Sequence, residues 1–313
     1  MSVRIGIGPG LGVSLSPREY WRWVDYCEEA RIDSIWHSDQ LLGGTMEPVA
    51  LLAALAARTQ RMRFGTNAIV AAFRDPIVLA KQLATIDWLS EGRVFPVFGV
   101  GNASDPYWAA TGADPKARGR RADEVIMLVR MLLKQDTVEF TGAHYRYSGP
   151  GVFPRPARPM PLWIGGQSPA AYRRTALLGD GWLGGLTGAV AAADARQQIE
   201  VALAETGRSI EPDHYGTSLP LRIGAEGDPA VQAARARLMA RIPEQDRGSL
   251  EQSFAIGPPD AIVALLQGYV ASGIHKFVVL PLARDADDLM AQTELLVRTI
   301  IPQIENQPLA TPL

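Results

Sequence analysis

Residues 161–182, PLWIGGQSPAAYRRTALLGDGW, contain one repeat of the pattern that decides the fold. The apolar run PLWIG predicts a short strand, the stretch from Pro169 predicts a helix, and GDGW leads into a second strand. A strand, a helix and another strand in succession are typical of a parallel sheet. The first strand ends in Gly165 and Gly166, directly before the helix, so bare backbone faces the start of that helix.

The same alternation extends over the whole chain of 313 residues. Ser16 and Glu19 form a predicted capping box for the first helix, and Asp75 is the predicted cap of a later one. Eight units of this kind predict a (β/α)8 barrel, a TIM barrel, that forms a single domain over residues 1–313. The expected strands cover 3–8, 34–38, 62–70, 93–101, 161–165, 181–185, 215–224 and 276–282.

The stretch 135–161 interrupts the alternation before the fifth strand. It contains a predicted hairpin, TVEFTGAHYRYSG, and a proline-rich crossing, PGVFPRPARPMP. An irregular stretch of this length in a compact domain is usually a functional loop or a local subdomain. We therefore expect an insertion here that contributes to a substrate pocket.

Composition excludes several classes of function. The net charge of −2 provides no basic surface for nucleic acid or an anionic membrane. No apolar run reaches the length of a membrane span, and the first residues lack the apolar stretch of a signal peptide. The one cysteine, Cys27, is spaced like a buried helix residue and fits a reducing compartment. A cytoplasmic protein is expected.

Several catalytic and binding motifs are absent from the sequence. The glycines after the first strand, at 6, 8, 10 and 12, do not match G-x-G-x-x-G, so a Rossmann site is not supported. No serine matches G-x-S-x-G, and the histidines are too scattered for a metal site. Only His37 follows a strand toward the expected active end, and the alternation of the strand allows it to point outward instead.

Active sites of this fold lie where the strands end, on the loops that follow them. Asp39 lies at the end of the second strand, where it either caps the next helix or contacts a ligand. Residues 165–168, GGQS, form either a tight turn or an anion site, because free N–H groups and a helix start attract negative charge. Gly184 lies in the next loop, GWLGGLTG, which would share a bound phosphate.

Several segments together resemble the bacterial luciferase-like superfamily of flavin-dependent monooxygenases and F420-dependent oxidoreductases. The resemblance extends from the first strand to the last helix and is specific in the order and spacing of its motifs. The segments are GRVFPVFGVG, YWAATGADPKARGRRADE, FTGAHYRY, RPMPLWIGGQSPAAYRRTALLGDGW and FAIGPPDAIVALLQGYVASGIHKFVVLP. The family fold is a TIM barrel with an insertion, which agrees with the strand pattern.

The resemblance implies roles for individual residues. GTNAIV matches the family's bulge with a non-prolyl cis peptide, which would lie between Asn67 and Ala68 against the central ring of the coenzyme. Asp39 matches a residue at the edge of that ring. Residues 165–168, Gly165, Gly166, Gln167 and Ser168, match the clamp for the tail phosphate. The implied coenzyme is F420, which we slightly prefer, or FMN.

Two positions depart from the family pattern and bear on the reaction. Gln40 stands where many deazaflavin-dependent members have a histidine, and Asn102 stands where sugar-phosphate-oxidising members have an acid. Neither amide is a general acid or base near neutral pH, which disfavours a sugar dehydrogenase. The candidate catalytic residues are Asp39, Gln40 and Asn102, and the candidate walls of the substrate pocket are Trp36 and Asn102.

Two functions stay open on these grounds. The first is an oxidoreductase acting on a small organic substrate, by hydride transfer with F420 or oxygenation with FMN. The second is a flavin-binding barrel without turnover that acts as a carrier or partner. The resemblance also implies a homodimer through the helices PVALLAALAART and PIVLAKQLATIDWL, and a separate flavin or F420 reductase.

Overall fold

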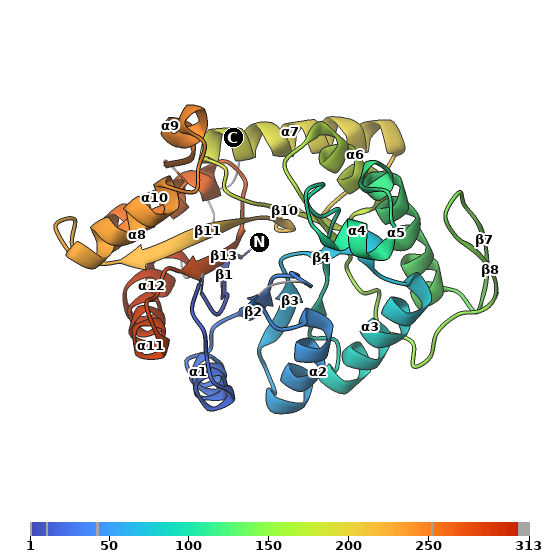
Figure 1. Ribbon diagram of the computed structural model, residues 1–313, viewed down its shortest axis with the longest axis horizontal. Coiled ribbons are helices and arrows are strands. Elements are labelled where there is room, and N and C mark those ends of the chain that lie inside the picture. Colours follow the sequence, from blue (N-terminus) through green and yellow to red (C-terminus); the bar gives the residue numbers. More distant parts are fainter. Residues whose placement is uncertain (1, 11, 42–43, 252, 306–313) are drawn as a thin grey trace.

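The computed structural model describes residues 2–10, 12–41, 44–251 and 253–305. Within this part of the chain, strands lie at the centre and helices surround them (Figure 1). The central strands are β1 (Arg4–Ile7), β2 (Ser34–His37), β3 (Arg63–Thr66), β4 (Ile69–Val70), β5 (Val94–Phe95), β6 (Val97–Gly99), β9 (Trp163–Gly165), β10 (Gly181–Gly184), β11 (Tyr215–Ile223), β12 (Ala255–Gly257) and β13 (Lys276–Pro281).

The helices follow the strands in the expected alternation. They are α1 (Pro17–Glu29), α2 (Pro48–Arg58), α3 (Pro76–Ser90), α4 (Tyr107–Thr111), α5 (Arg118–Lys134), α6 (Pro169–Leu178), α7 (Ala189–Thr206), α8 (Pro229–Met239), α9 (Arg247–Glu251), α10 (Pro259–Ala271), α11 (Ala286–Leu295) and α12 (Ile301–Ile304). A π-helical turn, Leu296–Ile300, joins the last two. Residues 306–313 of the expected domain lie outside the described part.

The central sheet closes into the predicted barrel. Its order is β4-β6-β9-β10-β11-β13-β1-β2-β3-β5, and its strands pair in parallel. β3 and β4 are two halves of one strand, interrupted at Asn67–Ala68, and β5 and β6 are two halves of the next, interrupted at Pro96. At this break Thr66 Oγ1 donates to the carbonyl of Val97 and accepts from its N–H, both at 3.0 Å, so one side chain replaces the missing ladder bonds.

One strand was not expected from the sequence. β12 pairs in parallel with the far end of β11, beside the main path of the sheet. Only Ala255, Ile256 and Gly257 form it, and so short an apolar run between helices resembles a loop in the sequence.

The expected helix caps are confirmed. Ser16 and Glu19 form the capping box of α1, and the Asp75 carboxylate accepts the N–H groups of Ile77 and Val78, each at 2.9 Å, at the start of α3. Ser168 caps α6 in the same way, with its hydroxyl 3.2 Å from the N–H of Ala171. These caps satisfy donors that would otherwise be free at the helix starts.

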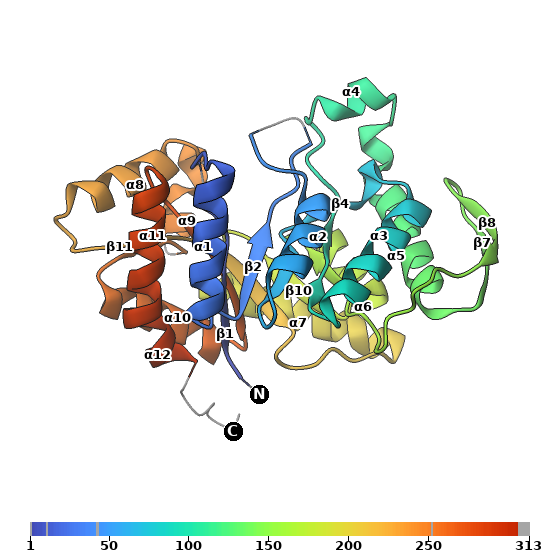
Figure 2. The same cartoon turned by 90° about the horizontal axis from the view of Figure 1, so that it is seen from below.

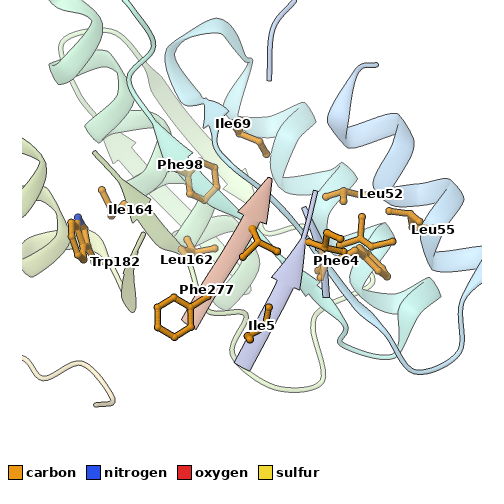
Figure 3. Packing of buried hydrophobic residues seen from close by; sticks show 14 of the residues in the cluster. Ile5, Leu52, Leu55, Phe64, Ile69, Phe98, Leu162, Ile164, Trp182 and Phe277 are labelled. Carbon is orange, nitrogen blue, oxygen red and sulfur yellow. The ribbon is translucent and has the colours of Figure 1, made fainter. Parts of the chain in front are cut away.

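Alternation along the strands separates two apolar layers. Outward residues such as Phe64, Phe98 and Ile164 pack against the helices, as Figure 3 shows for one part of this layer. Inward residues form a smaller cluster inside the barrel: Trp36, Val97, Trp163, Leu183 and Val278. Cys27 is fully buried in the outer layer, where burial raises its thiol pKa, so its predicted role as a small core residue is confirmed.

The predicted hairpin is present, and the expectation that the insertion contributes to the substrate pocket remains a prediction. β7 (Thr137–Thr141) and β8 (Arg146–Pro150) pair antiparallel beside α5, and the Glu124 carboxylate of that helix accepts the N–H groups of Ala143, His144 and Tyr145. The insertion follows a helix, so it starts at the end of the barrel opposite to the strand ends. Figure 2 shows it on the outside, whereas α4 lies on the side to which β2 points.

None of the described helices combines the length and hydropathy needed to cross a bilayer.

Candidate functional site at the strand ends

Asp39 is held where β2 ends and is the most constrained carboxylate of the predicted site. Its side chain is 0% exposed. One oxygen, Oδ2, accepts the N–H of Val70 at 3.0 Å and the guanidinium of Arg74 at 2.9 Å. Arg74 also pairs with Glu47 at 2.7 Å. Asp39 therefore joins the end of β2 to the end of β4.

The second oxygen of the same carboxylate is free. Asp39 Oδ1 is buried and has no hydrogen-bond partner among the described residues. Buried carboxylate oxygens are nearly always hydrogen-bonded, because an unsatisfied acceptor costs about 1–3 kcal/mol. An acceptor held in this state fits a donor on a bound molecule, which is the role implied for Asp39 at the edge of a coenzyme ring.

The peptide bond between Asn67 and Ala68 is cis, as the family resemblance predicts. The Asn67 side chain donates to Ser218 Oγ at 2.9 Å, across the interior of the barrel on β11. Its backbone N–H donates to the carbonyl of His37 at 2.7 Å. Asn67 thus ties the break in the third strand to two other strands.

Ala68 lies beside two strand ends that have no side chain. A Cβ built at Gly99 or at Gly165 would lie 3.4 Å from the Cβ of Ala68. Gly99 is the last residue of β6, Gly165 is the last residue of β9, and Ala68 lies between β3 and β4. The only side-chain atom at these three neighbouring positions is the methyl group of Ala68. We call Ala68, Gly99 and Gly165 the small-residue face. Such a face allows a flat ligand to approach the backbone closely.

The two predicted phosphate loops are joined to each other. The side-chain amide of Gln167 donates to Thr187 Oγ1, and the indole of Trp182 donates to the carbonyl of Gly166 at 2.8 Å. Gly166 has φ of +132°, a conformation that favours glycine, and its carbonyl and N–H groups bridge β9 and β10. The prediction that these loops lie side by side is therefore confirmed.

Local structure also accounts for part of this glycine pattern. A Cβ at Gly184 would lie 2.7 Å from the Trp182 ring, so this glycine makes room for an indole. The hydroxyl of Ser168 caps its own helix. Residues 165–168 therefore form a tight turn that leads into a capped helix, and phosphate binding by these residues and by Gly184 remains a prediction.

Gln40 and Asn102 are exposed, and the structure does not bring either side chain to Asp39. Asn102 Oδ1 accepts the N–H and hydroxyl of Ser104 at 3.1 and 3.0 Å, and its carbonyl accepts the indole of Trp108 at 2.7 Å. These bonds start the segment that leads into α4, close to where the strands end (Figure 2). The roles of both amides toward substrate remain predictions.

Trp36 does not line the substrate pocket, and that prediction is wrong. Its side chain points into the barrel, is 1% exposed, and leans back along β2 until the indole donates to Ser34 Oγ at 2.8 Å. Glycines at 6 and 65 leave room for the ring, because a Cβ at either position would lie within 3 Å of it. Trp36 therefore fills the end of the barrel at which the strands begin.

His37 points outward, as the alternation of its strand allows. Its Nε2 lies 3.0 Å from the hydroxyl of Tyr20 on α1, and burial lowers its pKa from 6.5 to about 3. His37 is therefore neutral at physiological pH and belongs to the helix layer rather than to the site.

This histidine makes stability depend on pH. The unfolded chain binds a proton at this histidine near pH 6.5, and the folded chain does not. The contribution of neutral His37 to the free energy of unfolding is therefore fully present above pH 6.5 and is lost as the pH falls toward 3. We expect the loss to approach about 1.4 kcal/mol per pH unit below pH 6. The double variant Tyr20→Phe/His37→Leu lacks this part of the pH dependence. Urea unfolding of the parent protein and the variant between pH 7 and pH 4.5 measures the difference in the free energy of unfolding. An unchanged pH slope would contradict the assignment.

Sequence reasoning missed the partners of the predicted residues. Arg74, Thr187 and Ser218 each bind a predicted site residue through a side chain. Arg74 had a visible signal, since it is a charged residue directly before the Asp75 cap at the end of a strand. Ser218 had none, because it lies 151 residues from Asn67 and meets it only when the barrel closes.

Comparisons with known proteins agree with this architecture. A curated F420-dependent glucose-6-phosphate dehydrogenase from Amycolatopsis mediterranei is 26% identical over 310 residues, covering 88% of this chain and 92% of the relative. One of the same name from Nocardia farcinica is 29% identical over 290 residues, covering 88% and 83%.

Solved structures match the fold closely. A monooxygenase, RslO1, from Streptomyces bottropensis has a TM-score of 0.82 at 22% identity, over 96% of this chain and 99% of that one. An F420-dependent secondary alcohol dehydrogenase, solved with an F420–acetone adduct, has the same TM-score at 18% identity, over 98% and 100%. At these identities the likeness shows the fold alone. The family model described as luciferase-like monooxygenase matches residues 1–276, and the chain belongs to this family.

Proposed function

We propose that the protein is an oxidoreductase that holds F420 or FMN at the strand ends and acts on a small organic substrate. The observation that carries the proposal is the free, buried Oδ1 of Asp39 close to the small-residue face. A flat ring fits against Ala68, Gly99 and Gly165, and a ring-edge donor fits Asp39 Oδ1. The helix start at 165–168 fits the phosphate of the tail.

F420 is the preferred coenzyme. The two curated relatives described above are named as F420-dependent, and one similar solved structure contains an F420 adduct. FMN is the alternative, because another similar solved structure, the oxygenating constituent of a 3,6-diketocamphane monooxygenase, is in complex with FMN. When bound, F420 would supply hydride transfer and FMN would supply oxygen activation. The chain's own part is to fix the coenzyme with Asp39 and the small-residue face, and to present one side of it to the substrate.

We propose that the substrate differs from the sugar phosphate named for the relatives. By the family resemblance, many deazaflavin-dependent members have a histidine where this chain has Gln40, and sugar-phosphate-oxidising members have an acid where it has Asn102. An amide binds a carbonyl or ring nitrogen by hydrogen bonds but does not transfer a proton near neutral pH. The proposal therefore favours an acceptor that needs little acid from the protein.

Turnover tests the enzyme against the alternative of a carrier without catalysis. Purified protein is mixed with reduced F420 or reduced FMN and a panel of small carbonyl, enone and aromatic acceptors, with and without oxygen. We expect acceptor-dependent oxidation of reduced F420 that does not need oxygen, with a separate reductase supplying the reduced coenzyme. Coenzyme binding without oxidation by any acceptor would favour the carrier.

A charge introduced at the phosphate loop tests the tail site. Gln167→Glu keeps the shape of the side chain and adds one negative charge next to the start of α6. Repulsion of the tail phosphate is expected to weaken F420 binding about tenfold, measured by fluorescence titration. Gln198→Glu, an exposed change of the same kind on α7, is the matched control and keeps full affinity. Equal F420 affinity of the two variants would contradict the proposal that residues 165–168 bind the tail phosphate.

We also propose that the protein forms a homodimer through the outer side of α3. This helix exposes apolar side chains to solvent: Ile77, Val78, Trp88 and Leu89. Trp88 is 66% exposed, and large apolar patches on a monomer mark interaction sites. A second copy of the chain would cover this face.

Trp88→Glu is expected to convert the dimer to a monomer. A charge buried without a partner at the centre of an interface would raise the dimer dissociation constant at least a hundredfold. Light scattering after size-exclusion chromatography measures the mass. Val190→Glu, at an exposed apolar residue of α7, is the control and stays dimeric. A monomeric parent protein would contradict the proposal.

A further inference from the structure

A cavity of about 680 Å³ opens to solvent between the helices outside the barrel, where α7 begins beside α10. This volume lies in the usual range of ligand pockets. Its walls are accessible, because Val190 on α7 is 78% exposed and Ala191, Ala264 and Gly268 are exposed as well. One end of the cavity reaches Gln167 of the predicted phosphate loop.

The start of α7 provides this cavity with free hydrogen-bond donors. No side chain caps the helix at Gly188, and the N–H groups of Ala189, Val190 and Ala191 donate to no described residue. All four residues line the cavity. Because α7 runs over 18 residues, its start carries a partial positive charge in addition to these N–H groups. A carboxylate in the cavity could accept them.

Tyr172 of α6 adds a hydroxyl group to the same cavity. The residue is only 9% exposed, and its ring packs edge-on against Trp182 at a centroid distance of 6.0 Å. The hydroxyl has no hydrogen-bond partner among the described residues, yet they do not enclose it. Burial and the charge of Asp194 raise the pKa of Tyr172, so the hydroxyl keeps its proton at neutral pH and can donate it.

Asp194 brings a negative charge next to these donors. It is exposed, lines the cavity and makes no ion pair or hydrogen bond with any described residue. Asp194 follows Val190 by one helical turn, and side chains on a helix lean toward its N-terminus, so the carboxylate lies over the first turn of α7. The helix start and Asp194 therefore present opposite charges side by side.

These two charges restrict what the cavity could bind. A simple anion would be attracted by the start of α7 and repelled by Asp194, and a simple cation would experience the reverse. A zwitterion satisfies both groups. The remaining walls include the apolar side chains of Leu186, Leu250 and Leu265, which favour an aliphatic group on the ligand.

We propose that this cavity is a second binding site, for a free α-amino acid with an aliphatic side chain. The α-carboxylate accepts the free N–H groups at the start of α7 and the hydroxyl of Tyr172. The ammonium group donates to Asp194, and the aliphatic side chain packs against Leu186 and Leu265. The coenzyme takes no part in this site, so the proposal stands whether or not the protein uses F420.

Titration with L-leucine in a calorimeter, without coenzyme, tests the site with a readout that does not depend on activity. Saturable binding of one leucine per chain is expected. Two probes of similar shape each lack one charge: isocaproate has no ammonium group, and isoamylamine has no carboxylate. Each is expected to bind at least tenfold more weakly than leucine, because it leaves one side of the site without its charged partner.

Gly188→Asp tests the start of α7 and includes a check on folding. The new side chain would cap the first turn, so the free energy of unfolding is expected to stay the same or rise. Leucine is expected to bind at least tenfold more weakly, because the cap occupies the N–H groups and repels the ligand carboxylate. Asp194→Asn is expected to weaken leucine about tenfold. Glu205→Gln, at an exposed acid near the other end of α7, is the control and leaves binding unchanged.

Three results would overturn the proposal: no saturable binding of leucine, equal affinity for leucine and either probe, or equal leucine affinity of the parent protein and either Gly188→Asp or Asp194→Asn. The first of these would mean that only water occupies the cavity.

Discussion

Asp39→Ala is expected to lower the coenzyme-dependent rate at least a hundredfold and the free energy of unfolding by about 3 kcal/mol. The stability loss follows because Arg74, whose side chain is only 13% exposed, loses its buried partner, and the N–H of Val70 loses its acceptor. The rate loss follows because Oδ1, the free acceptor offered to the coenzyme, is removed. Urea unfolding and F420 titration measure the two effects separately.

Two further variants separate the roles of this carboxylate. Asp39→Asn keeps an oxygen for Val70 and nearly the same shape, so we expect partial recovery of stability but weak coenzyme binding. Glu47→Gln breaks the other ion pair of Arg74 and retains an acceptor for Ala50, which Glu47 caps at the start of α2. Its stability is expected to change by less than about 1 kcal/mol, because Glu47 is exposed to solvent, and its F420 affinity to stay the same. Weaker F420 binding in Glu47→Gln would show that the charge of Arg74, rather than Asp39, decides the affinity.

Gly165→Ala is expected to weaken F420 binding 10- to 100-fold while the protein stays folded. The new methyl group would lie 3.4 Å from the Cβ of Ala68 and from Val97, an ordinary contact that the fold accommodates. It would, however, occupy the small-residue face on which the ring is proposed to lie. F420 fluorescence titration measures the affinity, and thermal unfolding checks the fold.

Gly268→Ala is the matched control for this substitution. Gly268 lies in α10, and a Cβ there meets nothing within 4 Å. The change adds the same methyl group and favours the helix slightly. It is expected to leave F420 affinity unchanged. Equal affinity of Gly165→Ala and the parent protein would place the ring elsewhere.

The sequence was sufficient to predict the elements because their signals are local. Ser16 with Glu19 and Asp75 before Pro76 mark helix starts through contacts over three residues, and all of them are present in the structure. The cis peptide at Asn67–Ala68 followed from the family resemblance, and the adjacency of the loops after β9 and β10 followed from the order of the strands. These predictions needed no knowledge of how distant strands meet.

The contents of the barrel could not be predicted, because they depend on the direction and length of side chains. Alternation places Trp36 inside, but only the structure shows its ring leaning toward the start of β2, away from the site. The same is true of the pairing of Asp39 with Arg74, and of Trp163, whose ring occupies the space that Gly181 leaves. The position of the hairpin β7–β8 beside α5 depends on the direction of that helix, which the composition of the insertion does not indicate.

Titration of the purified protein with F420, and separately with FMN, tests the central claim most directly. Both compounds are fluorescent, and binding against the small-residue face is expected to change that fluorescence in a saturable way. We predict one site per chain with micromolar affinity for F420, weakened in Asp39→Ala and Gly165→Ala but not in Gly268→Ala. Micromolar binding of FMN with none of F420 would reverse the preferred coenzyme, and no saturable binding of either would contradict the account.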